Sequence, residues 1–322
     1  MLYLNDRHMT DAGYDWGELI DTVEAAVATA DRGDYAQPVK PYLRFGDTRN
    51  RIIAMPAYIG GGFRAAGIKW IASFPGNLER GLPRAHGVIV LNDADSGRPE
   101  AILNGTLPNR LRTAAVSGLV LRRWLAAAGR MRARLRIGIV GWGPIGRAHM
   151  DMCDSVLGDA CTYALHDRRG IDPASIPPER RPRARIVDDW RDAYEEADVF
   201  ITCTVSDRRY IDAPPRPGML LLHVSLRDYA SDALAGVQRV IVDDWAEVCR
   251  EDTDIERLHR EQGLARSDAI TLAAALRAPG DAAFPAGETV LFCPMGMAIF
   301  DMAVATYIVR RAVDRGCGDR LD

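Results

Sequence analysis

The first stretch of the chain combines one amphipathic helix with several short strands. From Asp15 to about Asp31, apolar residues recur at the three- and four-residue spacing of a helix face, and Gly33 marks the end of the pattern. Three strand-like runs follow, separated by Gly-rich, Pro-rich or Asp-Ser-Gly turns. They cover residues 51–59, 66–74 and 86–93. The pattern predicts a β-meander within a mixed α/β segment.

The middle of the chain alternates strand and helix patterns with short connections, which is typical of a parallel sheet. A helix with few breakers, residues 113–129, leads into it. Six strands are predicted, and several are continuous hydrophobic runs, as expected where both faces of a sheet are covered. These strands are residues 135–141, 161–167, 184–189, 198–205, 218–225 and 237–244. Six such strands match a Rossmann sheet.

Beyond Pro294 the pattern becomes helical again. One side of the predicted helix, residues 295–313, carries Ile299, Met302, Ala303, Thr306 and Val309. We expect this helix to return to the first domain. The predicted fold class is α/β, with a Rossmann dinucleotide-binding domain inserted into a mixed α/β substrate-binding and dimerisation domain, an arrangement that periodicity alone does not show. The expected parts are residues 1–115, 116–294 and 295–322.

Composition narrows the functional classes. The 322 residues carry a formal net charge of -3, so a global basic field and a nucleic-acid partner are not expected. The N-terminus carries Asp6, Arg7 and Asp11 where a signal peptide needs an unbroken apolar run, and no run approaches the ~20 residues of a membrane span. The six cysteines are scattered without a C-x-x-C pair, which predicts neither disulfides nor a metal site. We expect a cytoplasmic protein with no membrane partner.

The strongest motif is a dinucleotide-binding loop. Gly141, Gly143 and Gly146 have G-x-G-x-x-G spacing directly after an apolar strand and at the start of a helix. The first glycine allows the tight turn, the second lets backbone N–H groups approach a pyrophosphate, and the third permits close packing of helix on strand. The intervening Pro144 and Ile145 belong to the same predicted cofactor-binding loop.

Asp167 ends the next strand, roughly 20 residues beyond the glycines, where a carboxylate accepts hydrogen bonds from ribose hydroxyls. This favours NAD over NADP. Two alternatives stay open. Arg168 and Arg169 could pair with a 2′-phosphate or lie against an adenine, and Asp167 could be a solvated turn residue.

Three cations in the first domain are candidates for binding substrate carboxylates. Lys69 is the most suggestive, because its strand neighbours are apolar and a cation in such a strand is usually paired or functional. Arg44 and Arg112 are the others, although an arginine in a chain with 41 Lys and Arg is more often a surface charge.

Asp228 follows the fifth predicted strand, at the edge of the sheet where open α/β folds place ligands. A carboxylate there could move a proton to or from a substrate nitrogen, or simply form a turn or cap a helix. Thr202 and Thr204 end the fourth strand and could meet the cofactor or be ordinary β-branched strand residues. His86 and His223 are of lower priority, because a lone histidine beside a strand is more often structural.

These motifs resemble the ornithine cyclodeaminase/μ-crystallin family over essentially the whole chain. The segments RIIAMPAYIGG, AGIKWIAS, GVIVLNDADSG and RTAAVSG look like the family's substrate domain, GWGPIG like its nucleotide loop, and CPMGMAIFDMA like its C-terminal helix. A narrower similarity, to the dehydrogenases that make 2,3-diaminopropionate for siderophores and related natural products, rests on QPVKPYLR, ITCTVSDRRYI, VIVDDWAEVCRE and PMGMAIFDM.

The resemblance implies a reaction and a site. Those dehydrogenases oxidise N-(2-amino-2-carboxyethyl)-L-glutamate with NAD, and hydrolysis of the imine releases L-2,3-diaminopropionate and 2-oxoglutarate. The family's carboxylate-binding cations fall on Arg44, Lys69 and Arg112, and Asp228 takes the acid/base position. Family members are typically homodimers formed through their substrate domains, so a homodimer is expected.

Two other readings remain. Ornithine cyclodeamination or cyclic imine reduction would use the same cofactor site with another pocket. Ornithine cyclodeaminases, however, usually carry their catalytic Asp in a loop containing Gly and Pro, whereas this loop is VSLRDYASD. A non-catalytic NAD(P)-dependent binding protein of the μ-crystallin type would bind nucleotide without turnover.

Overall fold

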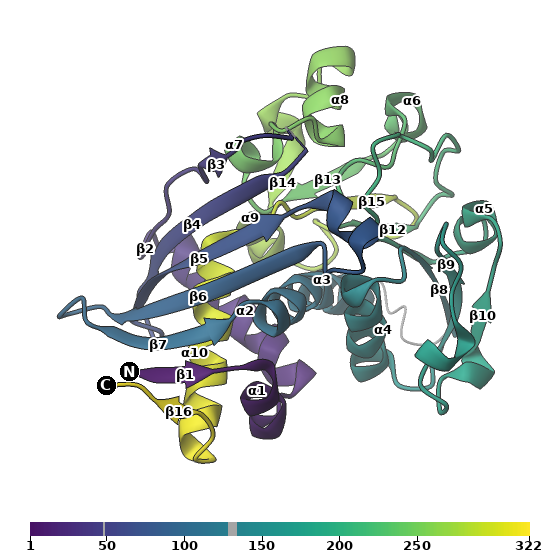
Figure 1. Ribbon diagram of the computed structural model, residues 1–322. Helices are drawn as coiled ribbons and strands as arrows, with labels where there is room; N and C mark the ends of the chain where they lie inside the picture. The colour runs from purple at the N-terminus through teal and green to yellow at the C-terminus, as the bar shows by residue number, and fades with distance from the viewer. Residues whose placement is uncertain (48, 128–133) are drawn as a thin grey trace. The chain divides into compact units, whose positions relative to one another are not determined.

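The computed structural model describes residues 1–47, 49–127 and 134–322 (Figure 1). The chain divides into two compact units. The first comprises Met1–Ala115 with Gly296–Asp322, and the second comprises Val116–Met295. Over the described residues, no helix is both long and apolar enough to cross a bilayer.

The first unit is built on a mixed sheet of eight strands in the order β16-β1-β7-β6-β5-β4-β2, with β3 also paired to β4. The strands are β1 Leu2–Leu4, β2 Tyr35–Ala36, β3 Tyr42–Leu43, β4 Arg51–Ile59, β5 Ala65–Ser73, β6 Ala85–Asp93, β7 Pro99–Asn104 and β16 Asp319–Arg320. The predicted meander is confirmed, because β4, β5, β6 and β7 pair in succession and antiparallel.

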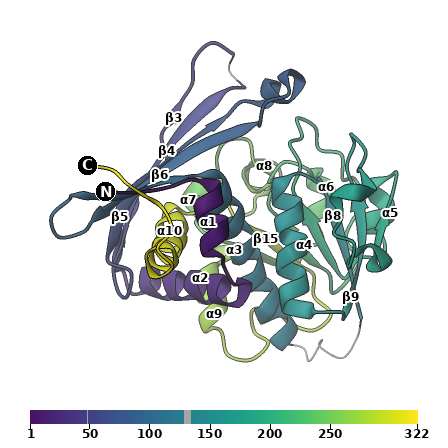
Figure 2. The same cartoon turned by 60° about the horizontal axis from the view of Figure 1, so that its bottom comes forward.

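Helices cover one face of this sheet. They are α1 Asp6–Ala12, α2 Trp16–Asp31 and α10 Ala298–Asp314. The side chain of Asp15 caps α2 by accepting the backbone N–H of Glu18 at 2.9 Å. The C-terminal helix α10 packs on β4, β5 and β6 and on α2, and Figure 2 shows α10 and α2 on the same side of the strands. Strand alternation therefore gives this sheet one helix-covered face and one outer face.

The second unit is a doubly wound sheet of eight parallel strands in the order β10-β9-β8-β11-β12-β15-β13-β14. The strands are β8 Leu135–Val140, β9 Cys161–His166, β10 Ala184–Ile186, β11 Val199–Thr202, β12 Leu220–His223, β13 Arg239–Val242, β14 Ala269–Thr271 and β15 Val290–Cys293. The helices are α4 Pro144–Leu157, α5 Trp190–Tyr194, α6 Ser231–Leu234, α7 Trp245–Val248, α8 Asp254–Gln262 and α9 Leu272–Arg277. Figures 1 and 2 both show α4 and α5 on opposite sides of β8 and β9. The predicted fold class of this domain, a Rossmann-type parallel sheet, is confirmed.

The strand count was wrong, since six strands were predicted and the sheet has eight. The added strands, β14 and β15, are only three and four residues long; β14 runs directly into α9, and β15 follows a Gly- and Pro-rich segment, residues 278–289. The run 184–189 was also overextended, because β10 ends at Ile186.

The connecting helix α3, Thr106–Ala127, begins seven residues earlier than predicted. Asn104 accepts the backbone N–H of Thr106 at 2.9 Å, and Pro108 falls in the first turn, where a proline is tolerated. Arg112, which directly precedes the predicted helix, consequently lies inside α3. The predicted last residues of this helix, 128 and 129, lie outside the described part of the chain.

Candidate functional site

Lys69 in β5 is completely buried and binds the carboxylate of Asp301 in α10. Its Nζ lies 2.8 Å from both oxygens of Asp301 and donates to Oδ1 of Asn109 at 3.1 Å. Arg112 joins the same group, with Nε 3.2 Å from Asp301 Oδ1 and Nη2 donating to Asn109 Oδ1 at 2.8 Å. The structure thus brings together two of the three predicted carboxylate-binding cations.

The electrostatics of Lys69 are finely balanced. Burial lowers the pKa of its ammonium and the positive charge of Arg112 lowers it further, while Asp301 raises it, with a net value of about 7. When Lys69 is protonated, Lys69, Arg112 and Asp301 carry a net charge of +1. Such a group favours an additional anion, and a substrate carboxylate meets that requirement.

The segment that leads into α10 holds the cations in place. The backbone carbonyl of Gly296 accepts a hydrogen bond from the buried Lys40 Nζ at 2.9 Å. Gly296 has a φ of 86°, and a Cβ there would collide with the guanidinium of Arg112. Only glycine suits both conditions at this position.

Arg44, the third predicted cation, is exposed after β3. Its guanidinium carbon lies 5.4 Å from the centroid of the Tyr42 ring, a cation–π distance. Its role in binding a substrate carboxylate stays a prediction.

In the second unit, the glycine loop follows β8 and opens α4. Gly141 has a φ of 96°, and a Cβ on it would collide with the backbone of Cys203. A Cβ on Gly146 would overlap the carbonyl oxygen of Gly141, so this glycine permits the close approach of α4 to the strand. A Cβ on Gly143 would meet no protein atom within 4 Å. Gly143 is the N-cap of α4, so this open space lies where the helix presents free N–H groups, which fits a pyrophosphate.

Asp167 follows β9 and is tied to this loop. Its Oδ2 accepts the backbone N–H of Trp142 at 2.8 Å and its Oδ1 accepts that of Arg169 at 3.0 Å. The carboxylate thereby fixes the turn between the first two glycines, and it retains acceptor capacity for ribose hydroxyls.

Asp228 is fully buried, in the loop after β12. The hydroxyl of Thr204 donates a short hydrogen bond to its Oδ1, and that of Ser225 donates one to its Oδ2. These two hydroxyl donors fix the orientation of the carboxylate. Thr202, at the end of β11, contacts Nδ1 of His223 at 2.7 Å. Both predicted threonines thus bind polar side chains at the ends of β11 and β12: Thr204 binds Asp228, and Thr202 binds His223.

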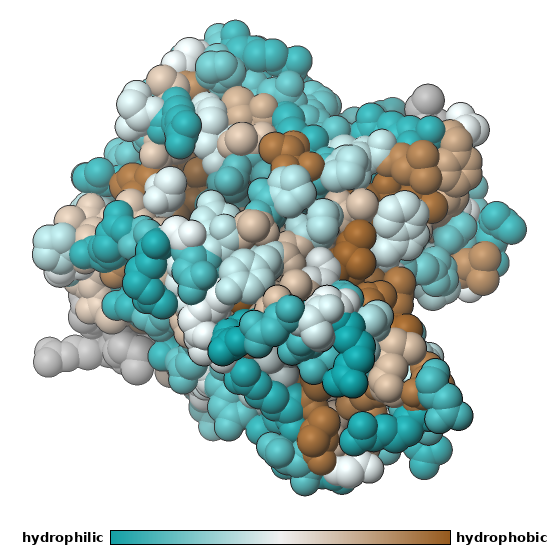
Figure 3. Space-filling view, turned by 90° about the vertical axis from the view of Figure 1, so that its left-hand side faces the viewer, coloured by the Kyte–Doolittle hydropathy of each residue, from teal (hydrophilic) through white to brown (hydrophobic). Residues whose placement is uncertain are grey.

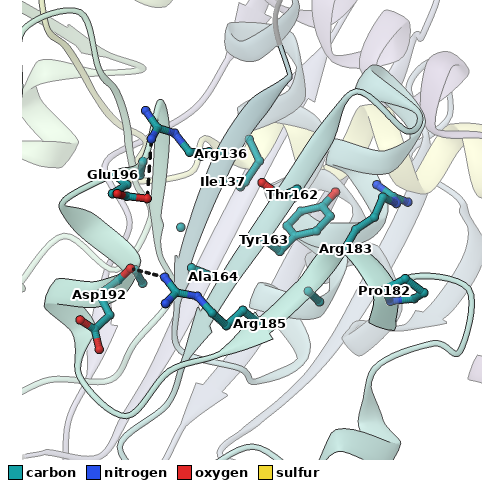
Figure 4. Close-up of a pocket in the computed structure, with 14 residues that line it drawn as sticks. Arg136, Ile137, Thr162, Tyr163, Ala164, Pro182, Arg183, Arg185, Asp192 and Glu196 are labelled. Carbon is teal, nitrogen blue, oxygen red and sulfur yellow. Dashed lines mark hydrogen bonds and ion pairs between the residues drawn. The ribbon is translucent and has the colours of Figure 1, made fainter.

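A surface hollow in the second unit is unrelated to these groups. It lies beside β8, β9, β10 and α5, and its lining includes Arg136, Arg185 and Glu196 (Figure 4). Arg136 is 3.6 Å from Glu196, and Arg185 donates to the backbone oxygen of Asp192 at 3.3 Å. The lining residues of β8 precede the glycine loop, toward the other end of the strand. The hollow is therefore no candidate for the cofactor site.

Sequence reasoning missed several members of these clusters, among them Asn109, Ser225, Asp254 and Asp301. A signal for Asp301 was present. It is the single acidic residue in the predicted apolar helix 295–313, and a buried carboxylate needs a cationic partner such as Lys69. The predicted one-sided stripe was also too narrow, because Ala298 through Ala305 are all buried.

Comparisons with known proteins agree with this architecture. The family model described as "Ornithine cyclodeaminase/mu-crystallin family" matches residues 7–316. The N-((2S)-2-amino-2-carboxyethyl)-L-glutamate dehydrogenase of Staphylococcus aureus is 31% identical over 341 residues, covering 100% of this chain and 98% of the relative.

Two solved structures share the fold. The Δ1-pyrroline-2-carboxylate reductase of Thermococcus litoralis, in complex with NADH and L-proline, superposes with a TM-score of 0.84 at 24% identity, covering 100% of both chains. An archaeal alanine dehydrogenase dimer with bound NAD superposes with a TM-score of 0.80 at 20% identity, covering 100% of this chain and 99% of that one. Together with the family match over nearly the whole length, they lead to one conclusion. The chain belongs to the ornithine cyclodeaminase/mu-crystallin family.

Proposed function

We propose that this chain is an NAD-dependent oxidoreductase acting on a CH–NH group. Its substrate is N-(2-amino-2-carboxyethyl)-L-glutamate, and the products are L-2,3-diaminopropionate and 2-oxoglutarate. The activity serves siderophore or other natural-product biosynthesis. The Staphylococcus aureus relative supports the choice of substrate because the similarity extends over both chains.

The observation that carries the proposal is the group formed by Lys69, Arg112 and Asp301. Two buried or nearly buried cations share the Asp301 carboxylate and retain a net positive charge. A substrate with three carboxylates explains why a core lysine and arginine are retained at such a cost in desolvation. In the proposed site Lys69, Arg112 and Arg44 bind substrate carboxylates.

The residues proposed to bind the cofactor all lie in the second unit. The loop from Gly141 to Gly146, with Pro144 and Ile145, holds the NAD pyrophosphate at the N-terminus of α4. Asp167 would bind the ribose hydroxyls, and Thr202 and Thr204 are the other residues that would meet the cofactor. When bound, NAD accepts the hydride released from the glutamate Cα.

Asp228 handles the proton. Loss of a hydride from Cα leaves a carbon–nitrogen double bond, and the substrate nitrogen gives up a proton to the Asp228 carboxylate. Water then adds to the imine carbon and the carbon–nitrogen bond breaks. Asp228 returns its proton to the departing amine, which balances the reaction.

The experiment is NADH formation at 340 nm with purified protein, NAD and N-(2-amino-2-carboxyethyl)-L-glutamate, with L-ornithine in parallel and products identified by mass spectrometry. NADH, diaminopropionate and 2-oxoglutarate in equal amounts support the proposal. Conversion of ornithine alone to proline and ammonia, without net NADH, would assign a cyclodeaminase. Binding of NAD without turnover of either compound would assign a binding protein.

The Asp228→Asn variant controls for the proton step. It should still bind NAD and lose on the order of 10²-fold or more in kcat, because its amide cannot accept the proton. A variant as active as the wild type would remove Asp228 from the mechanism.

We also propose a homodimer formed through the outer face of the first-unit sheet. Trp70 is 40% exposed on this face, whereas the adjacent Lys69 is buried on the other. Trp70 pairs with Ala54 and Val88, and the next outward residue of β5, Ile68, is only partly buried. A partly exposed apolar sheet face is the kind of surface that a second subunit covers.

A further inference from the structure

The loop that carries Asp228 is tied to the start of α8. The backbone N–H of Asp254, the first residue of α8, donates to the carbonyl of Leu226 at 2.8 Å. In return, Asp254 Oδ2 accepts the backbone N–H groups of Asp228 and Tyr229, each at 2.9 Å. Leu226 has a φ of 66°, which is unusual for a leucine and needs such contacts to persist.

The same carboxylate also holds His223. Asp254 Oδ2 lies 2.8 Å from His223 Nε2, and Oδ1 accepts Arg209 Nε–H at 3.0 Å. Burial raises the pKa of Asp254, but the hydrogen bond and charge of His223, the N–H of Tyr229 and Arg209 together lower it below its usual value. An ionised carboxylate only accepts hydrogen bonds, so Nε2 of His223 carries a hydrogen.

The other ring nitrogen of His223 faces the proposed acid/base group. Its Nδ1 lies 3.9 Å from Asp228 Oδ2 and 2.7 Å from the hydroxyl of Thr202. That hydroxyl donates to a neutral Nδ1 and accepts from a protonated one. The ring of His223 is therefore held at both nitrogens, by Asp254 and by Thr202.

Several other titratable or charged residues contact or face Asp228 and Asp254. Among the described residues they include Arg209, Arg227, Asp252, Tyr210, Tyr229, Cys203 and Cys293. Burial raises the pKa of both tyrosines and both cysteines, so these four stay neutral. Arg209 stays cationic and pairs with Asp252 at 2.8 Å on its exposed side.

We propose that Asp254 is a positioning residue for Asp228. The carboxylate fixes the loop backbone through two N–H groups and holds the His223 ring so that Nδ1 faces Asp228. The inference rests on the proposed function, in which Asp228 accepts the substrate's proton. Neither Asp254 nor His223 needs to touch the substrate.

Two variants separate charge from structure. Asp254→Asn keeps an oxygen for His223 and the two N–H groups but removes one negative charge, so the half-maximum of the acid limb of kcat/KM should move to lower pH by roughly half a pH unit or more. Asp252→Asn, which also loses a carboxylate beside Arg209, should leave the profile unchanged.

A third variant tests the positioning role. Asp254→Ala removes the acceptor for the loop and should lower kcat by about tenfold or more, with NAD affinity unchanged. If this variant fails to fold, Asp254→Asn still decides the question. A profile of Asp254→Asn that coincides with the wild type would overturn the inference, even if the wild type oxidises the proposed substrate.

A measurement without turnover keeps the two hypotheses apart. In hydrogen exchange of the protein without ligand, the backbone amides of Asp228 and Tyr229 should exchange faster in Asp254→Ala than in the wild type, because they lose their acceptor. Unchanged exchange would refute the role of Asp254, whereas an inactive wild type with faster exchange in the variant would refute only the proposed reaction.

Discussion

At the scale of single residues, the charge of Lys69 connects burial with substrate binding. Its pKa of about 7, which burial and Arg112 lower against the opposing effect of Asp301, means that the ammonium is present below pH 7 and is lost as the pH rises through that value. A substrate carboxylate favours the charged form, so binding and protonation of Lys69 are linked.

This linkage predicts the pH dependence of KM. KM for the substrate should be constant below about pH 7 and should rise above it, by up to about tenfold per pH unit. Lys69→Met should have a high KM with no such rise. Initial rates between pH 6 and 9 provide the measurement, with KM for NAD as the internal control. A wild-type KM that is flat across this range would contradict the assignment of Lys69.

Asp301 should be essential for stability because it faces two cations. Asp301→Asn leaves the ammonium of Lys69 without its carboxylate in a fully buried position, and removal of one partner of a buried pair costs about 3–5 kcal/mol. Urea unfolding at pH 6, where Lys69 is charged, measures the loss. Asp314→Asn, at the exposed end of the same helix, should change stability by less than about 0.5 kcal/mol. Equal stability of the two variants would show that Asp301 does not hold the cations.

Single residues also show the limit of sequence reasoning. Lys69 was recognised because a cation among apolar strand residues needs a partner, and that expectation is confirmed. The partner, Asp301, lies 232 positions away, and a pairing of that kind depends on tertiary packing that periodicity does not encode. Asp254 was missed for the same reason, since the groups that donate hydrogen bonds to its carboxylate lie at least 25 positions earlier in the chain.

At the scale of elements, strong patterns predicted the structure well. The run 51–59 coincides with β4, and the helix 15–31 differs from α2 by one residue, because uninterrupted alternation and an N-cap Asp are local signals. The start of α3 and strands β14 and β15 were missed. A proline is common in loops, so Pro108 in the first turn of α3 concealed the start of the helix. A strand as short as β14 has no clear sequence pattern of its own, because its stability comes from the neighbouring strands of the sheet.

The glycine loop allows two glycines to be compared within one element. Gly143→Val places a side chain in open space, so it should leave stability nearly unchanged while weakening NAD binding by about tenfold or more, because it fills the proposed pyrophosphate position. Gly146→Ala should instead destabilise the protein by about 1–3 kcal/mol, because its Cβ overlaps the Gly141 carbonyl. NADH fluorescence titration and thermal melting separate the two effects. Unimpaired NAD binding by a folded Gly143→Val protein would place the cofactor elsewhere.

At the scale of the whole molecule, each unit has its own part in the proposed function: the first binds substrate, and the second binds NAD and carries the acid/base residue. The first holds the cations in a sheet and a helix that are far apart in sequence, and the second holds the dinucleotide loop and Asp228 at the carboxyl ends of parallel strands. The second arrangement follows a general rule for open α/β sheets and was predictable. The first required the return of α10 to β5, an arrangement that periodicity alone does not show.

The proposed dimer gives the last prediction. Trp70→Glu places a charge in the middle of the outer sheet face, where it would be buried against a second subunit without a partner, so the dimer should dissociate to monomers. Exposed apolar residues also occur elsewhere, and Figure 3 shows hydrophobic patches scattered among hydrophilic ones on one side of the molecule. The control is therefore Val313→Glu, in α10, where the native valine is 54% exposed and a charge should leave the dimer intact.

Analytical ultracentrifugation of the wild type and both variants at micromolar concentration measures the outcome. A monomeric Trp70→Glu beside a dimeric Val313→Glu supports assembly through the β4–β6 face, provided that melting curves show Trp70→Glu to be folded. A wild type that is monomeric would rule out the dimer, and dissociation by Val313→Glu alone would move the interface to α10. Because Lys69 and Trp70 are consecutive in β5, loss of the dimer should also raise KM if the outer contact keeps this strand in register for substrate binding.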